Sequence, residues 1–224
     1  MLDTTDTTPA SGNPTLTDTS DMIGLHGVFR DALAAAPSLV RADANGDRRE
    51  TVAAYYDVVL RLLKAHHEGE DELLIPLLTQ RCAGQDLATV TRVAAQHGPV
   101  TDLITLARDR VAKWRSDPNA DAAEVRTALS AVQRKLIPHL DDEERAVLPI
   151  AAGVVTPDEW GQMPGHALRQ FEGDDLWLVL GLVFDHMTDD QRAVTQAHMP
   201  PHLMSGWREH GEPYYAAARA RLGG

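Results

Sequence analysis

Length, composition and charge exclude several classes of protein. The chain has 224 residues, 43% of them hydrophobic, which is enough to bury a sizeable core and too many for a wholly disordered protein. Its formal charge of −12 repels nucleic-acid phosphates, so we expect no nucleic-acid partner. The longest strongly apolar stretch, Leu176 to Phe184, is far shorter than the ~20 residues of a membrane span. The single cysteine, Cys82, and the lack of a secretion-type start lead us to expect a cytoplasmic protein with no membrane partner.

The first 20 residues differ in composition from the rest of the chain. Residues 1–20 are almost all Thr, Asp, Ser, Pro and Gly, which offer too little apolar surface to offset the entropy of ordering. We expect them to form a flexible tail. From Asp21 onward, apolar residues recur at alternating steps of four and three, with no long stretch of period two. This pattern predicts an all-α protein.

Clusters of turn-forming residues divide the region that follows the tail. They separate four predicted helices, at about 21–43, 48–81, 86–115 and 121–151. Short connections between long helices make sequential neighbours antiparallel, so residues 21–151 are expected to form an up-down-up-down four-helix bundle. Pro37 is expected either to kink the first helix or to mark its end, because proline lacks an N–H and clashes with the preceding turn.

The pattern changes after the fourth predicted helix. Residues 152–224 consist of shorter segments cut by prolines and glycines, with apolar bodies such as LWLVLGLVF. Several short helices are predicted there. A stretch of this size is expected to pack on the bundle as a helical C-terminal extension rather than to fold alone.

Polar side chains interrupt the apolar face of each predicted bundle helix. Steps of four and three along these faces place one histidine inward on every helix, and a glutamate one turn after two of those histidines. The six residues are His26, His66, Glu70, His97, His139 and Glu143. All four helices therefore direct polar groups toward a shared interior.

The spacing of the inward residues repeats along the chain. The second HxxxE pair lies 73 residues after the first, and the inward histidines of the two halves are 40 and 42 residues apart. A proline follows each pair, at Pro76 and Pro149. We interpret the bundle as a duplicated helical hairpin, in which the two HxxxE pairs meet at one depth about a pseudo-twofold axis.

Buried glutamates require a counter-charge. An unpartnered buried carboxylate costs several kcal/mol, and two that face each other cost more. No lysine lies on the inward faces, and the candidate arginine nearest to them, Arg108, follows His97 by about three helical turns. A pair of divalent cations fits best, bridged by the two carboxylates and capped by imidazoles, with coordination positions left open. Such oxygen and nitrogen ligands suit iron or manganese.

Other polar residues near the inward faces are assigned lesser roles. His67 neighbours a predicted ligand but falls off the inward face, so we expect it behind the ligands or in solvent. Thr101 is expected to donate a hydrogen bond into the site, and Tyr56 to pack or to line access. The neighbouring acids are expected to form solvated faces: Glu68, Asp71, Glu72, Asp141, Asp142 and Glu144. The remaining histidines are expected to be structural or at the surface: His166, His186, His198, His202 and His210.

With these motifs the chain resembles the hemerythrin-like family, also called HHE cation-binding domains. The resemblance covers about residues 21–151 and rests on LHGVF, KAHHEGEDELLIPLL, AAQHGPV and LIPHLDDEERAVLP. It implies a non-haem di-iron centre, with manganese or zinc left open as the metal. The ligands it implies are His26, His66, Glu70, His97, His139 and Glu143.

The chain departs from the oxygen-carrying members of that family at two places. Those proteins have a second histidine one turn from the third-helix histidine and an HxxxxD on the fourth helix, where this chain has Thr101 and an HxxxE. A more open, carboxylate-rich centre is therefore expected, which argues against simple reversible oxygen carriage. The resemblance implies binding of dioxygen, peroxide or nitric oxide, and we predict catalase-like or peroxidase-like redox activity on peroxide or nitric oxide.

Three other functions compete with this one. The main alternative is a non-catalytic sensor of oxygen, nitric oxide or iron that signals through residues 152–224 to an unknown protein partner. Ferritin-type iron oxidation is disfavoured, because no histidine has a glutamate three residues before it. A zinc protease is disfavoured because the nearest match to HExxH, at residues 67–71, lacks the second histidine.

Overall fold

The described part of the chain is helical. The structure, a computed structural model, describes residues 16–44 and 46–223, and within these it contains helices and no strand, as the sequence predicts. Residues 1–15 of the predicted tail lie outside the described part. Thr17, also in the predicted tail, is buried, and its N–H donates to the carbonyl of Ala152 at 2.9 Å. The prediction of a flexible tail was therefore wrong at this residue, because its backbone is bonded to a helix.

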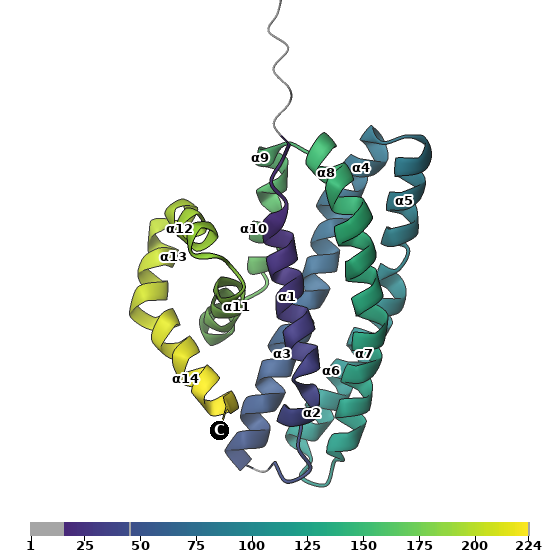
Figure 1. The fold of residues 1–224 in the computed structure, drawn as a ribbon. Helices are drawn as coiled ribbons and strands as arrows, with labels where there is room; N and C mark the ends of the chain where they lie inside the picture. The colour runs from purple at the N-terminus through teal and green to yellow at the C-terminus, as the bar shows by residue number, and fades with distance from the viewer. Residues whose placement is uncertain (1–15, 45, 224) are drawn as a thin grey trace, which may run out of the picture.

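Four helical columns stand side by side (Figure 1). The first is α1 (Ser20–Ala34) with α2 (Ala36–Leu39), and the second is α3 (Gly46–Gly69), η1 (Glu70–Leu74) and α4 (Ile75–Arg81). The third is α5 (Gly84–Ala94) with α6 (His97–Ser116), and the fourth is α7 (Ala122–Asp142), η2 (Glu143–Val147) and α8 (Leu148–Val154). Contacts join α3 to α6, α6 to α7, and α1 to both α3 and α7, so the columns enclose a common interior.

Two of the predicted helices are interrupted. Pro37 lies in the first turn of α2, after α1 has ended at Ala34, so it starts a new helix where its missing N–H is tolerated. The third predicted helix breaks at Ala95 and Gln96, and α6 begins at His97. The break thus falls directly before one of the inward histidines.

Wide, π-helical turns accompany prolines. η1, η2 and η3 (Trp207–Gly211) each begin six residues before a proline, at Pro76, Pro149 and Pro213. Proline has no N–H to donate, and its ring clashes with the carbonyl four residues earlier, so a wider turn lets the helix continue through it. η1 and η2 begin at Glu70 and Glu143, the glutamates of the two HxxxE pairs.

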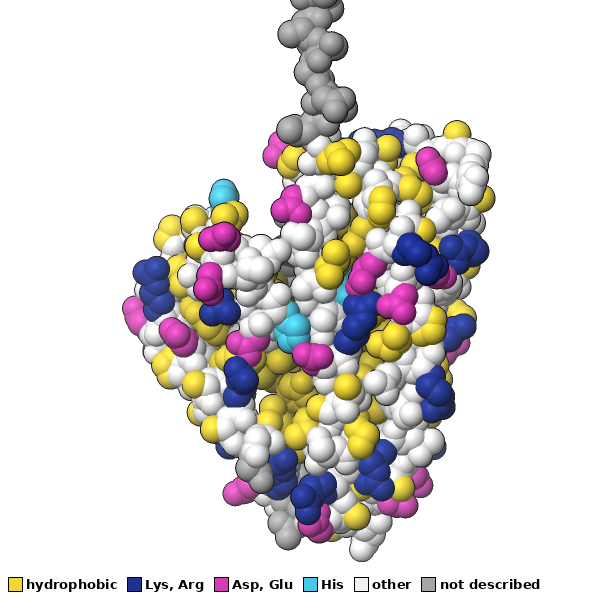
Figure 2. Space-filling model, in the orientation of Figure 1, with side chains coloured by type: hydrophobic (Ala, Val, Ile, Leu, Met, Phe, Trp, Pro, Cys, Tyr) yellow, Lys and Arg dark blue, Asp and Glu magenta, His cyan; other side chains and the backbone are white. Residues whose placement is uncertain are grey.

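The residues after Val155 form short helices that cover one side of the columns. They are α9 (Pro157–Trp160), α10 (Gln162–Leu168), α11 (Gly173–Asp185), α12 (Asp189–His198), α13 (Pro201–Gly206), η3 and α14 (Glu212–Gly223). α10, α11 and α14 contact α3, and α11 also contacts α1. Figure 2 shows hydrophobic side chains gathered where these helices meet the columns. Buried side chains of α11 belong to the same hydrophobic core as those of α1 and α3.

The longest apolar run of the sequence is part of this core. α11 has 13 residues and carries the LWLVLGLVF run, and its buried side chains include Val179, Leu180 and Phe184. Among the described residues, no helix combines the length and apolarity that crossing a membrane requires. The hydrophobic character of this segment is explained by its packing against α1 and α3.

Candidate metal centre

The four columns bring the predicted inward residues together. Each of the six has a relative exposure of 5% or less, and His67, at 2%, lies among them. α1 supplies one histidine, α3 two, α6 one and α7 one, while the glutamates come from the first residue of η1 and of η2. The cluster therefore consists of His26, His66, His67, Glu70, His97, His139 and Glu143.

Two groups within this cluster have the composition of metal sites. Group A comprises His67, Glu70, His97 and His139, and group B comprises His26, His66, Glu70 and Glu143. In each group the possible ligand atoms lie within 4.8 Å of one another. Glu70 belongs to both groups, so its carboxylate lies where it can contact ions in either.

The closest approaches between imidazoles and carboxylates show how the groups meet. Glu70 places Oε1 3.6 Å from Nε2 of His66 and Oε2 3.4 Å from Nε2 of His97. Oε2 of Glu143 lies 3.5 Å from Nε2 of His26 and 3.7 Å from Nε2 of His139. These distances exceed the 2.7–3.2 Å of an N–H···O hydrogen bond. The atoms converge without bonding one another, as ligands around a common cation do.

Most of the inward atoms have no other partner. Among the described residues, no hydrogen bond reaches either oxygen of Glu70, Oε2 of Glu143, either nitrogen of His67, or Nε2 of His26, His66 and His139. No lysine or arginine in the described part forms an ion pair with either glutamate, and Arg108 pairs instead with Asp57. Such a concentration of orphaned buried donors and acceptors requires an explanation. A divalent cation fits these residues, because it satisfies carboxylate oxygens and imidazole nitrogens together.

Burial sets the protonation of the cluster. Burial, together with neighbouring imidazoles, lowers the pKa of His66 and His67 well below the usual value, and burial lowers that of His139 to about 4. These imidazoles are therefore neutral near pH 7, which is the form that binds metal. Burial and the nearby Glu143 raise the pKa of the Glu70 carboxyl well above its usual value. Without a cation, the site favours a neutral Glu70.

Three of the cluster histidines have a side-chain partner at Nδ1, the ring nitrogen that faces away from the cluster. His26 Nδ1 donates to Glu144 at 2.8 Å, His97 Nδ1 donates to Asp71 at 2.7 Å, and His139 Nδ1 lies 3.2 Å from Gln96 Oε1. A proton held on Nδ1 leaves Nε2 as the free donor atom toward the cluster. Asp71 is exposed, as predicted, and Glu144 is partly exposed, but each also bonds an inward histidine, a role that the sequence analysis did not assign to them.

The position of these two acids follows from the repeat. Asp71 and Glu144 each come directly after a cluster glutamate, and each reaches a histidine on a different column. Glu144 also accepts from Arg30 at 2.6 Å. Burial raises the pKa of Glu144, but the bonds from His26 and Arg30 outweigh it and hold this pKa at about 2. The sequence signal is the acid that directly follows each cluster glutamate, in the pairs Glu70-Asp71 and Glu143-Glu144.

His67 lies inside the cluster and is 2% exposed, so of the two positions predicted for it, behind the ligands or in solvent, the second was wrong. Its ring stacks on that of His97, with centroids 4.5 Å apart and planes at 12°, and meets His139 edge-on at 5.1 Å. His66, one residue earlier, instead lies 5.1 Å from the ring of His26. Consecutive helical residues point about 100° apart. Both can be buried here because α3 contacts α1 and α6 and is covered by α10 and α11.

The remaining candidates form no hydrogen bond with the cluster in the described part of the chain. The hydroxyl of Tyr56 donates instead to the carbonyl of Ala32 at 2.9 Å. Thr101 is half-buried, and its hydroxyl bonds none of the cluster residues, so the predicted hydrogen bond into the site is absent there. None of the five C-terminal histidines joins the cluster; His186 Nδ1 donates to the carbonyl of Leu182, while His202 and His210 are exposed.

Comparisons with known proteins agree with this geometry. The model of the hemerythrin HHE cation-binding domain matches residues 17–151, which contain the whole cluster and the four columns except the last three residues of α8. Searches of curated proteins and of solved structures return no match. The matched region ends before α9, so the family model does not cover the C-terminal helices.

Metal removal is expected to destabilise the protein through the uncompensated cluster. Treatment with a chelator should lower the thermal unfolding midpoint of the wild type. Glu70→Gln should reduce this difference and stabilise the metal-free form by on the order of 1 kcal/mol, because the buried carboxyl must take up a proton at a cost in free energy and the amide need not. Scanning calorimetry with and without chelator measures both effects. Equal chelator sensitivity in the wild type and in Glu70→Gln would contradict the assignment of Glu70 as a ligand.

The acids behind the histidines are expected to tune metal affinity. Asp71→Ala and Glu144→Ala should each weaken binding about 10–100-fold, because the imidazole loses the acceptor that fixes its orientation. Glu72→Ala and Asp141→Ala are the matched controls, since neither carboxylate bonds a cluster histidine. Competition with a chromophoric chelator gives the affinities. If all four variants lose affinity alike, the effect is one of general charge rather than orientation.

Proposed function

Because this chain belongs to the hemerythrin HHE cation-binding family, we propose that it is a non-haem di-iron protein that binds dioxygen, peroxide or nitric oxide. We further propose that it turns over peroxide or nitric oxide in the manner of a catalase or peroxidase. In this proposal the four columns are the predicted up-down-up-down bundle, whose interior is the reaction site. The observation that carries the proposal is the shared position of Glu70 between two buried ligand groups.

Two ions rather than one are supported by the number and placement of the ligands. Each group offers four side chains, with Glu70 common to both, and the oxygens of Glu70 lie near imidazoles of different groups. Oxygen and nitrogen ligands of this kind suit iron, and manganese and zinc accept the same donors. Four side chains per group leave positions for a small ligand on an ion that favours octahedral geometry.

A fifth imidazole distinguishes this centre from the one predicted from the sequence. Thr101 replaces a histidine of the oxygen-carrying relatives, and this replacement alone would remove an imidazole from the side of His97. The ring of His67 stacks on His97 and supplies an imidazole there. With Glu143 in the HxxxE of the fourth column, the set becomes five histidines and two glutamates. We propose all seven residues as ligands.

The chain's own groups prepare the site for this chemistry. When bound, a pair of irons supplies or accepts two electrons together, which matches reduction of one peroxide to water and oxidation of another to dioxygen. Asp71, Glu144 and Gln96 hold the protons of three imidazoles on Nδ1, and the surrounding apolar core excludes bulk water. Arg30 keeps Glu144 charged and in place behind His26.

The stoichiometry tests whether the two groups are separate sites. We expect the wild type to hold about two ions per chain, and His67→Ala and His26→Ala to retain about one each, because each removes a ligand from a different group. Glu70→Ala should lose both, since it belongs to both groups. Tyr56→Phe, which lies outside the cluster, is the control that keeps two. Elemental analysis after dialysis gives the ratios, and loss of both ions in every variant would indicate a single site.

Turnover tests the enzymatic part of the proposal. Iron-loaded wild type should consume hydrogen peroxide or nitric oxide at least about tenfold faster than the His66→Ala, His139→Ala double variant, whose two groups each lack an imidazole. Gas-electrode and absorbance assays measure the rates. Equal rates in the two proteins would contradict the proposed enzymatic function.

One observation favours the sensor as a second candidate. α10 packs on α3 and η1, so residues after the matched domain contact the element that supplies His66, His67 and Glu70. In the same samples, limited proteolysis with and without iron separates the two functions. A sensor changes the protection of residues 152–224 when metal binds and shows no turnover, whereas an enzyme shows turnover whether or not the protection changes.

A further inference from the structure

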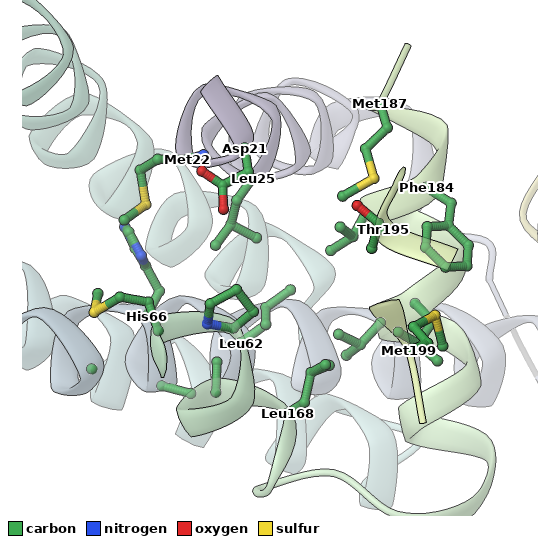
Figure 3. Close-up of a pocket in the computed structure, with 18 of the residues that line it drawn as sticks. Asp21, Met22, Leu25, Leu62, His66, Leu168, Phe184, Met187, Thr195 and Met199 are labelled. Carbon is green, nitrogen blue, oxygen red and sulfur yellow. Dashed lines mark hydrogen bonds between the residues drawn. The ribbon is translucent and has the colours of Figure 1, made fainter. Parts of the chain in front are cut away.

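An apolar pocket lies between the columns and the C-terminal helices. Its volume is about 170 Å³, and α1 and α3 form one wall while α10, α11 and the residues around α12 form the other. Figure 3 shows His66 at one end and Phe184, Met187 and Met199 at the other, with Leu25, Leu62 and Leu168 between them. The pocket therefore runs from the metal centre to the C-terminal part of the chain.

The polar groups of the pocket are few. Asp21, His66 and Thr195 line it among otherwise apolar side chains. Asp21 Oδ1 already accepts from the indole N–H of Trp160 at 3.0 Å and from the backbone N–H of Met22 at 2.9 Å. The lining contains no lysine or arginine. An anion would find no counter-charge here, and a charged group of either sign would lose its hydration to apolar walls.

His66 is the cluster histidine that reaches this pocket, and it differs from three of the other four at Nδ1. Nδ1 of His26, His97 and His139 has a side-chain partner behind it, whereas within the described residues Nδ1 of His66 has none. His66 is also the one residue of groups A and B that lines the pocket. The imidazole edge of His66 therefore lines the pocket and can contact a bound molecule.

The walls are built to adapt to an occupant. Four of the six methionines of the chain line the pocket: Met22, Met163, Met187 and Met199. Methionine is unbranched and polarisable, so it fills irregular space and adjusts to different shapes. An apolar cavity of about 150 Å³ in another protein stays dry and takes up benzene or xenon. The present volume falls in that range.

We propose that this pocket binds a small, uncharged, largely apolar molecule of about benzene size, in contact with His66. The occupant touches α1 and α3 on one side and α10 and α11 on the other, so it joins the metal-binding columns to the C-terminal helices. Apolar walls select against charge, and the volume selects against larger ligands. This site shares only His66 with groups A and B, and the inference holds for the protein with or without metal.

Fluorine NMR on the full-length, metal-free protein tests the proposal. Fluorobenzene is the probe, and 4-fluorobenzoate and 4-fluorobenzylamine are charged probes of similar shape. We expect fluorobenzene to bind, unlabelled benzene to displace it, and the two charged probes to bind at least about tenfold more weakly because their charges would be desolvated. Absence of fluorobenzene binding, or equal or tighter binding of a charged probe, overturns the proposal.

Variants at one lining residue locate the binding. Ala167→Leu fills the pocket and should weaken fluorobenzene binding at least about tenfold, while Ala167→Ser, which keeps the size, should leave it nearly unchanged. If Ala167→Leu does not fold, Leu168→Ala enlarges the same pocket and should shift the preference toward fluoronaphthalene. Binding that none of these variants alters lies elsewhere and overturns the assignment. Because the experiment uses metal-free protein, a negative result contradicts the pocket proposal alone and does not bear on the di-iron proposal.

Discussion

The arrangement of this protein depends on the burial of two carboxylates and five imidazoles inside an otherwise apolar interior. Glu70 and Glu143 are each 2% exposed or less, and no cationic side chain in the described part pairs with them. Such groups are strongly unfavourable in an apolar core unless something satisfies them. The hydrophobic core above and below the cluster must therefore hold the columns together against this cost, and a bound cation turns the same groups into a stabilising contact. Metal binding and folding are coupled for this reason.

The duplicated pattern places both the cluster glutamates and the acids that bond the cluster histidines. In each half, a glutamate at the start of a π-helical turn belongs to the cluster, and the acid after it bonds a histidine from another column. One dipeptide thus supplies a cluster carboxylate and an orienting group. The same turn is tied to a proline six residues after the glutamate, at Pro76 and at Pro149. A short sequence repeat therefore encodes the local backbone, the buried glutamate and the acid that orients a histidine.

Helical periodicity was sufficient for much of the fold and for six residues of the cluster. The steps of four and three identify inward positions on each column, because a helix presents the same face every three to four residues. They do not account for His67, whose burial depends on the elements that surround α3. They also do not reveal that Asp71 and Glu144 bond histidines, since these contacts join columns that are far apart in sequence. The position of a residue on its helix therefore indicates whether it points inward, but it does not indicate which residues of the other columns it contacts.

The C-terminal helices, which lie outside the matched domain, cover the side of α3 that carries His66. α3 would expose one side if the columns stood alone, and that side carries Leu62, Ala65, His66 and Gly69, which line the pocket with residues of α10 and α11. A Cβ on Gly69 would lie 3.3 Å from the ring of His166, so the backbone of α3 and helix α10 approach closely at this point. This cover keeps the outer edge of His66 away from bulk water. The strength of every charge interaction in the cluster rises as water is excluded. Residues beyond the domain that binds the cation therefore help to set its environment.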